Sequence, residues 1–436
     1  MKYTRPRGTR DFLPGEMAAR RYVEQKIRRV FIRFGYKEVA TPTFEHLELI
    51  TAKSGEDIVA HLYHFKDKGG RDLALRPELT APVMRLYVNE LQNQQKPLRL
   101  YYFGNCFRYE RPQAGRYREF FQAGVELIGS ASPEAQAEVI ALANTVLEEL
   151  GLREYELHIG NIGILRKILA ENGVGEEDQT HIMGVIDKGD EAQLEEELRR
   201  LGLPEEEKRV ILGVLELKGP RSEVIARAEA LLAGRETVLS ELRGFEEILN
   251  ALESFGVRNY RLNLGIARGL DYYTGMVFEI YAYKLGAEKQ ICGGGSYSLA
   301  EVFGGKPVAT SGFAFGFDRI LLALEKEDVK LSDSERTLFM VIPMGRELVP
   351  QAIEIASIVR KSYACELEVM RRKVKKALAY ADARRIPYVI LVGEEIKAGK
   401  VLLKDMRAKE QREVRVEELE SVLSAIAGDN HNPALD

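Results

Sequence analysis

The 436-residue chain contains few of the residues that covalent or metal cross-links require. Only three cysteines occur, Cys106, Cys292 and Cys365, and no two are separated by two residues. Neither a disulfide framework nor a cysteine-ligated zinc site is therefore indicated. Of six histidines, only His61 and His64 lie close together. In an alternating, strand-like stretch, a separation of three directs the two rings to opposite faces, so we expect no metal site there.

Long apolar runs are also absent. No segment reaches the ~18 apolar residues that a membrane-spanning helix requires, and the N-terminal sequence MKYTRPRGTR lacks the apolar core of a secretory signal. We therefore expect a cytoplasmic protein without a membrane partner. The hydrophobic fraction of 45% suffices for sizeable cores. The length predicts about three folding units of roughly 150 residues.

An excess of positive charge is missing too. The formal net charge of −4 argues against a protein that coats nucleic acid nonspecifically, because such proteins are usually basic overall. An RNA partner must therefore meet local basic patches. One candidate is the run RRKVKK at 371–376, which we predict to lie on a helix. Charged runs of this kind most often form a solvated face.

No Walker-type phosphate loop, Gly-x-x-x-x-Gly-Lys-Ser/Thr, occurs, but other segments are suited to binding phosphate. Residues 107–119, FRYERPQAGRYRE, place four arginines around a Pro-Gln-Ala-Gly turn. On a hairpin, these arginines can grip a triphosphate bidentately. The alternative is a solvated hairpin in which Glu110 and Glu119 pair with the arginines.

Two further segments carry similar chemistry. Residues 312–320, GFAFGFDRI, predict a strand feeding a helix, with Arg319 in a first turn that already favours anions. The alternative treats Asp318 and Arg319 as ordinary first-turn residues. Residues 268–275, RGLDYYTG, combine an arginine with two tyrosines and suggest a pocket for a ligand that is part anion and part polar ring. The alternative there is a buried pair between the arginine and the aspartate of this segment.

The remaining chain predicts three regions. Residues 1–160 mix helical and strand patterns: a helix at 17–34, a strand at 36–42, a hairpin tip at 64–71, and strands at 98–108 and 119–128. Glu, Lys, Arg and Leu dominate 173–235, which indicates an inserted helical domain. Strand-like sequence then resumes, ending in a helix at 316–326. Residues 336–427 contain apolar runs at 338–342 and 388–392, typical of buried strands in an α/β domain. We predict a disordered tail at 428–436.

Together, these motifs resemble the histidyl-tRNA synthetases. Residues 107–119 and 312–320 resemble motifs 2 and 3 of the class II aminoacyl-tRNA synthetases, and 268–275 resembles the histidine-specific signature of the family. Further matching segments are RGTRDFLP at 7–14, LRPELTA at 75–81 and ICGGGSY at 291–297. The last one departs from the family, which usually has Arg-Tyr-Asp where this chain has Ser296-Tyr297-Ser298.

The resemblance implies a fold. It implies an α+β class II catalytic domain, an antiparallel sheet flanked by helices, over residues 1–330, interrupted by the helical insertion at 173–235. A C-terminal α/β anticodon-binding domain follows at 336–427. The insertion is expected to reach the acceptor stem of tRNA. A homodimer is also implied, because motif 1, matched weakly by residues 17–42, builds the dimer interface in this class.

The resemblance also implies the reaction of a histidine–tRNA ligase. Such an enzyme activates L-histidine with ATP to histidyl-adenylate, releases pyrophosphate, and transfers histidine to the 3′ end of tRNA(His). A carboxylate with a pKa near ~3.5 is ionised at neutral pH, so the first step needs no general base. Positioning and charge stabilisation remain as the catalytic tasks. This agrees with a chain that offers arginines rather than a nucleophile paired with a base.

Roles carry over residue by residue. Arg108 and Arg268 are the implied catalytic residues: Arg108 holds the α-phosphate, and Arg268 bridges that phosphate and the histidine carboxylate. Mg²⁺ is expected on the β- and γ-phosphates, held largely by phosphate oxygens and water. ATP binding is implied for Arg108, Glu110, Arg116 and Arg319, and histidine binding for Glu78, Thr80, Gln122, Glu126, Arg268, Tyr272, Tyr273 and Tyr297.

Two alternatives stay open at this point. One is the non-catalytic, histidyl-synthetase-like regulatory subunit of ATP phosphoribosyltransferase in histidine biosynthesis, which binds histidine without charging tRNA. The complete arginine set and the C-terminal α/β domain oppose it. The other is a different class II synthetase, such as the prolyl or threonyl enzyme, against which the segment 268–275 argues.

Overall fold

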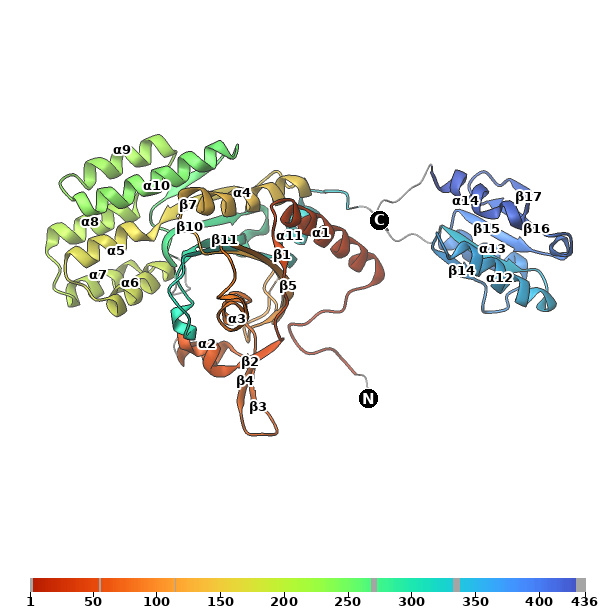
Figure 1. Ribbon diagram of the computed structural model, residues 1–436, viewed down its shortest axis with the longest axis horizontal. Coiled ribbons are helices and arrows are strands. Elements are labelled where there is room, and N and C mark those ends of the chain that lie inside the picture. The colour runs from red at the N-terminus through yellow and green to blue at the C-terminus, as the bar shows by residue number, and fades with distance from the viewer. Residues whose placement is uncertain (1–2, 55, 114, 268–272, 332–337, 429–436) are drawn as a thin grey trace. The chain divides into compact units, whose positions relative to one another are not determined.

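The computed structural model describes residues 3–54, 56–113, 115–267, 273–331 and 338–428 (Figure 1). The chain divides into two compact units. One comprises Met1–Phe12 and Val23–Lys330, and the other Leu13–Tyr22 and Leu331–Asp436. The predicted tail lies, apart from its first residue, outside the described residues. No helix among the described residues has the length and apolar character needed to cross a membrane.

A large, mostly antiparallel sheet forms the centre of the first unit (Figure 1). Its strand order is β1-β5-β6-β12-β11-β10-β7-β9-β8, in which only the pairs β1–β5 and β7–β9 are parallel. The two long strands predicted from alternation are confirmed as β5 and β6. The strands are β1 (Lys37–Glu38), β5 (Leu98–Phe107), β6 (Glu119–Ile128), β7 (Glu156–Asn161), β8 (Lys218–Gly219), β9 (Arg261–Asn263), β10 (Tyr273–Tyr281), β11 (Gln290–Tyr297) and β12 (Thr310–Gly316).

Several helices pack against this sheet. α4 (Pro133–Leu150) and α11 (Phe317–Lys326) both pack on β6, β11 and β12. α4 begins where the Ser132 side chain accepts the Ala135 N–H, and it ends at Gly151, whose φ of 83° is easily adopted only by glycine. α1 (Pro14–Arg33) buries Phe31 against the rings of sheet residues, at centroid distances of 5.5 to 6.1 Å.

The predicted strand at 36–42 is much shorter than expected. Only Lys37 and Glu38 pair with β5, and the chain then turns toward a separate three-stranded sheet. That sheet has the order β2-β4-β3, from β2 (Phe44–His46), β3 (His64–Lys66) and β4 (Asp72–Leu75). α2 (Leu47–Ser54) lies between β2 and β3 in the sequence, and α3 (Thr80–Leu86) follows β4.

The predicted hairpin tip at 64–71 is confirmed. Asp67 accepts the backbone N–H groups of Gly69 and Arg71 and so fixes the turn. The strand expected at His61 is wrong, because this residue ends the 3₁₀ helix η1 (Glu56–His61). Within the described ranges, no group of three or more His, Cys, Asp or Glu side chains could hold a metal ion.

A run of helices occupies 162–254 and extends beyond the 173–235 that composition indicated. The first and last helices of the run, α5 and α10, pack on each other, and α10 also packs on α4. Both contain a smaller fraction of charged residues than the helices between them, so a charge-rich composition does not mark them. The helices are α5 (Ile162–Glu171), α6 (Glu176–Lys188), α7 (Glu191–Arg200), α8 (Glu205–Leu215), α9 (Arg221–Leu231) and α10 (Glu236–Ser254).

The second unit contains a five-stranded sheet of order β14-β13-β15-β16-β17. The two apolar runs predicted as buried strands are confirmed as β13 and β15, and β13 pairs in parallel with β14 and β15. Separate hydrophobic clusters cover the two faces. Its elements are β13 (Phe339–Pro343), α12 (Val349–Val359), β14 (Cys365–Leu367), α13 (Val374–Ala383), β15 (Tyr388–Val392), β16 (Lys400–Asp405), β17 (Gln411–Arg415) and α14 (Leu419–Gly428).

The basic run at 371–376 lies only partly on a helix, contrary to the prediction. α13 begins at Val374, and Arg371 has a φ of 54° that no helix residue adopts. The preceding loop is organised by Glu368, whose buried carboxylate accepts the N–H of Met370 at 2.6 Å and the Arg372 guanidinium at 2.8 Å. Val369 and Met370 are left 74% and 67% exposed.

Gly294 of β11 should not tolerate a side chain. An added Cβ would lie 2.4 Å from the Gly312 carbonyl oxygen and 2.6 Å from the Phe278 ring, so neighbouring strands would have to separate. We expect Gly294→Ala to lower the free energy of unfolding by about 1–3 kcal/mol. Gly275→Ala on β10 is the matched control, because nothing lies within 4 Å of its added Cβ. Urea unfolding followed by circular dichroism measures both, and equal midpoints would contradict the prediction.

Candidate active site

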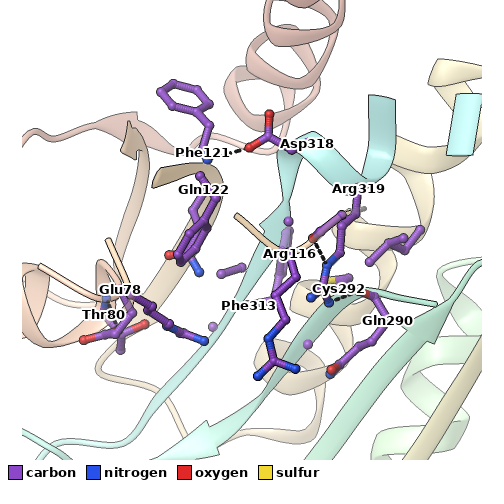
Figure 2. Close-up of a pocket in the computed structure, with 18 of the residues that line it drawn as sticks. Glu78, Thr80, Arg116, Phe121, Gln122, Gln290, Cys292, Phe313, Asp318 and Arg319 are labelled. Carbon is purple, nitrogen blue, oxygen red and sulfur yellow. Dashed lines mark hydrogen bonds between the residues drawn. The ribbon is translucent and has the colours of Figure 1, made fainter. Parts of the chain in front are cut away.

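A pocket opens on the large sheet, between β6, β10, β11 and β12, the start of α3, the loop at 108–118 and the start of α11 (Figure 2). It contains about 980 Å³ not filled by protein atoms, part of it open to solvent. Every predicted site residue that the structure describes lines it. These are Glu78, Thr80, Arg108, Glu110, Arg116, Gln122, Glu126, Tyr273, Tyr297 and Arg319.

Two predicted residues, Arg268 and Tyr272, lie outside the described residues. Tyr273 begins β10 directly after them and is buried, with its ring 6.2 Å from that of Tyr297 in an edge-on arrangement. The aromatic wall expected from the octapeptide is therefore present in its described part. The roles of all the predicted residues stay predictions.

Glu126 of β6, which is 1% exposed, is the most deeply buried ionisable side chain among the described residues that line the pocket. Its carboxylate accepts the Tyr102 hydroxyl at 3.0 Å on one oxygen and the Tyr297 hydroxyl on the other. The register of the sheet makes room for this arrangement. Gly312 of β12 stands opposite Glu126, and a Cβ there would fall 1.8 Å from the carboxylate. Gly124 likewise leaves space for the Tyr102 ring.

Burial changes the acid–base behaviour of this group. Desolvation raises the pKa of Glu126 to about 8, although hydrogen bonds from Tyr297, Tyr102 and Thr80 act in the opposite direction. Desolvation also holds the pKa values of Tyr102 and Tyr297 well above their usual range, so both phenols stay neutral. The resulting group can accept or give a proton near neutral pH, where imidazole also titrates.

Glu78 and Gln122 also line the pocket (Figure 2), and local structure orients both. The Glu78 carboxylate accepts the N–H groups of Thr80 at 2.6 Å and Ala81 at 2.9 Å, at the beginning of α3. Gln122 accepts the Cys106 thiol at 3.3 Å. Burial raises the pKa of that thiol to about 12, so it is a packing group rather than a nucleophile.

Arg116 and Arg319 lie across the pocket from Glu78 and Thr80 in Figure 2, and they form a cationic wall. Arg319 donates from Nε to the Gly115 carbonyl at 2.9 Å and from Nη1 to the Gln290 carbonyl at 2.8 Å. Arg116 pairs with Glu110. Burial acts to raise the pKa of Glu110, but this hydrogen bond and nearby guanidinium charges lower it overall.

The hairpin predicted at 107–119 is confirmed. It shows features of both alternatives, the phosphate-binding hairpin and the solvated hairpin. Gln113 and Arg116 form a β-bridge at the tip. The Glu110–Arg116 pair belongs to the solvated-hairpin alternative, whereas Arg108 and Arg116 face the pocket as a phosphate-binding hairpin requires. Arg108 donates to the Pro77 carbonyl at 3.0 Å. Arg111 is exposed and does not line the pocket.

The sequence assigns no role to two residues beside the site, although Arg10 lies in the family-like segment at 7–14. Tyr102 belongs to no motif. Its position could be inferred only from the strand register that places it opposite Gly124. Arg10 reaches Asp318 from the N-terminal segment, with Nη2 2.7 Å from the carboxylate. Asp318 is 4% exposed and also accepts the Phe121 N–H at 2.8 Å, so the view of it as an ordinary first-turn residue is wrong.

The family departure at 296–298 leaves the pocket lining intact. Ser296 donates to the Gln136 side chain of α4 at 2.6 Å and exchanges a 3.1 Å hydrogen bond with Ser311. Neither Ser296 nor Ser298 lines the pocket, whereas Tyr297 between them does. This follows from the alternation of side chains along a strand.

An antiparallel sheet carrying an arginine hairpin and a strand–helix junction with Arg319 defines the catalytic domain of a class II aminoacyl-tRNA synthetase. Comparison with known families matches residues 8–320 to histidyl-tRNA synthetase and residues 339–426 to an anticodon binding domain. The chain belongs to the histidyl-tRNA synthetase family, and the resemblance inferred from its motifs is confirmed.

Individual relatives agree. The histidine–tRNA ligase of Methanocaldococcus jannaschii is 51% identical over 421 residues, covering 96% of this chain and 98% of that protein. That of Archaeoglobus fulgidus is 49% identical over 425 residues, covering 97% and 100%. A crystal structure from Bacillus halodurans, described as an ATP phosphoribosyltransferase regulatory subunit/histidyl-tRNA synthetase, is 28% identical with a TM-score of 0.74, covering 87% and 96%. Because the two ligases are about half identical to this chain over nearly its full length, the synthetase is favoured over the regulatory alternative.

Replacing Glu126 by Gln should flatten the dependence of stability on pH. The pKa of Glu126 is about 8 in the folded chain against an ordinary value of 4.5, so the folded state holds a proton that the unfolded state has released. The resulting stabilisation is fully present below the pKa of Glu126 in the unfolded chain. It is lost as pH rises through the pKa of Glu126 in the folded chain. Urea midpoints measured between about pH 5 and pH 9 should fall more for wild type than for Glu126→Gln. Parallel profiles would contradict the assignment.

Proposed function

We propose that this pocket activates L-histidine with ATP, forming histidyl-adenylate and pyrophosphate, and that the chain then transfers histidine to the 3′ end of tRNA(His). The observation that carries the proposal is Glu126, a buried carboxyl held by two phenols at one end of a pocket whose opposite wall is cationic. Such a pocket suits a ligand with a polar ring at one end and a phosphorylated carboxylate at the other. We place the reaction in the cytoplasm and the chain in a homodimer.

Ring recognition is assigned to Glu126, Tyr273 and Tyr297. An imidazole presents one N–H donor and one acceptor nitrogen, and Glu126 can accept from the ring while a phenol donates to it. A phenyl or aliphatic side chain would leave the buried carboxyl and phenols without partners, which is a strong basis for rejection. Glu78 and Thr80 then take the ammonium group, and Gln122 a backbone group of the amino acid.

The adenylation step needs no proton transfer from the protein. A carboxylate oxygen of histidine attacks the α-phosphorus, and the bond to the bridging oxygen of pyrophosphate breaks. Arg108 stabilises the charge that develops on the α-phosphate oxygens. Arg268, outside the described residues, is assigned by resemblance to bridge this phosphate and the histidine carboxylate.

The outer phosphates are assigned to Arg116 and Arg319, with Glu110 near the adenine or its phosphates. Arg319 donates to the carbonyls of Gly115 and Gln290 in this structure. Phosphate oxygens bind a guanidinium more strongly than neutral carbonyls do, so ATP can displace these bonds. Mg²⁺ is proposed to arrive with the nucleotide, because arginines line the phosphate-facing end of the pocket and cannot bind a metal ion themselves. It would neutralise charge on the departing pyrophosphate.

In the transfer step, the terminal 3′-hydroxyl of tRNA attacks the carbonyl carbon of the adenylate and AMP leaves. The second unit is proposed to hold the anticodon. Its loop at 368–373 combines exposed Val369 and Met370 with Arg371, which suits stacking and phosphate contacts with unpaired nucleotides. The helices within 162–254 are proposed to reach the acceptor stem.

The test is ATP–pyrophosphate exchange without tRNA, run against all the standard amino acids. We expect exchange with histidine alone, because only imidazole satisfies the buried carboxyl and phenols together. Exchange with a different amino acid would overturn the assigned specificity. Histidine binding without any exchange would instead support the regulatory alternative.

Arg108→Ala should lower the histidine-dependent exchange rate by about 10²–10³-fold, because a guanidinium aimed at developing phosphoryl charge acts mainly in the transition state. Histidine affinity, measured by calorimetry, should change little. Arg111→Ala is the matched control on the same hairpin, since that side chain is exposed and lies outside the pocket. Equal losses in the two variants would rule out the specific role of Arg108.

A further inference from the structure

Arg10 makes a contact that the reaction as described does not use. Its Nη2 lies 2.7 Å from the Asp318 carboxylate, and its guanidinium stacks on the Tyr117 ring with 3.5 Å between its central carbon and the ring centroid. The centroid of the Phe12 ring lies 4.9 Å from the same guanidinium carbon. Arg10 thereby joins the N-terminal segment to the returning arm of the hairpin and to the beginning of α11.

A second contact holds the same segment against the hairpin. Arg118 donates its backbone N–H to the Gly8 carbonyl at 2.9 Å. Gly8 has a φ of 85°, and an added Cβ would lie 2.7 Å from the Arg118 side chain, so only glycine allows this approach. Residues 8–12 therefore cross the base of the hairpin at a fixed register.

The element held by Arg10 carries a phosphate-facing arginine. Asp318 immediately precedes Arg319 in the first turn of α11, and its second carboxylate oxygen accepts the Phe121 N–H of β6 at 2.8 Å. Arg319 in turn donates to Gly115 at the hairpin tip. Arg10 thus supports both the α11 side and the hairpin side of the cationic wall, without lining the pocket itself.

We propose that Arg10 is a positioning residue for ATP: through Asp318 and Tyr117, it fixes Arg319 and the returning arm of the hairpin in the geometry that receives the outer phosphates. The inference rests on the proposed adenylation. Stability alone is a poor explanation for the contact, because a buried ion pair commonly adds little over apolar packing. In addition, Arg10 Nε is buried without a hydrogen-bond partner in the part of the chain that the structure describes.

The experiment compares Arg10→Ala, Arg10→Lys and the control Arg5→Ala in ATP–pyrophosphate exchange, varying ATP and histidine separately. Arg5 occupies the same segment, but its side chain is 57% exposed. Its ion pair is a long one, with 3.8 Å between Nη1 and the Asp11 carboxylate. We expect Arg10→Ala to raise the KM for ATP about 10-fold or more and to lower kcat, while the KM for histidine changes less than about two-fold. Arg10→Lys should fall between, since it keeps the charge but not the planar stack. Arg5→Ala should match wild type.

The outcomes separate the hypotheses. Equal changes in both KM values, or an ATP KM equal to that of Arg5→Ala, would show that Arg10 is structural only. If Arg10→Ala does not fold, Arg10→Lys decides by the same comparison: a raised ATP KM supports the proposal, and an unchanged one contradicts it. Absence of histidine-dependent exchange in wild type would instead refute the proposed function.

Discussion

The site depends on one buried carboxyl held between two phenols. Glu126 is almost completely removed from water, and its cost of burial is offset by hydrogen bonds from Tyr102 and Tyr297. Those bonds exist because Gly124 and Gly312 leave space in neighbouring strands. The antiparallel register of β5, β6 and β12 therefore determines where the acid lies and what it can recognise.

The cationic wall follows a different principle. Its arginines remain charged at any relevant pH, and Arg116 and Arg319 already bond to a carboxylate or to backbone carbonyls. In the proposed reaction, the nucleotide phosphates replace these partners, because they bind a guanidinium more strongly than neutral carbonyls do. Under the proposed function, buried neutral or titrating groups provide specificity for the amino acid. Permanently charged arginines provide affinity for the nucleotide.

Much of this could be predicted from the sequence, because motifs and alternation are local signals. The strands at 98–107 and 119–128, the arginine hairpin, the strand–helix junction at Arg319 and the buried strands of the second unit all follow from them. The contacts of Tyr102 and Arg10 could not be predicted, because strand register sets the first and the path of the N-terminal segment sets the second. The sequence pattern predicts a helix over the whole basic run at 371–376, because charge and length cannot reveal the left-handed Arg371.

The central proposal is that Glu126 binds the imidazole of histidine at the buried end of the pocket. A crystal structure with bound L-histidine tests it most directly. We predict a ring nitrogen within hydrogen-bonding distance, about 3 Å, of the Glu126 carboxylate, with the substrate carboxylate directed toward Arg108. A ring that lies at the cationic wall, or that makes no contact with Glu126, would contradict the account.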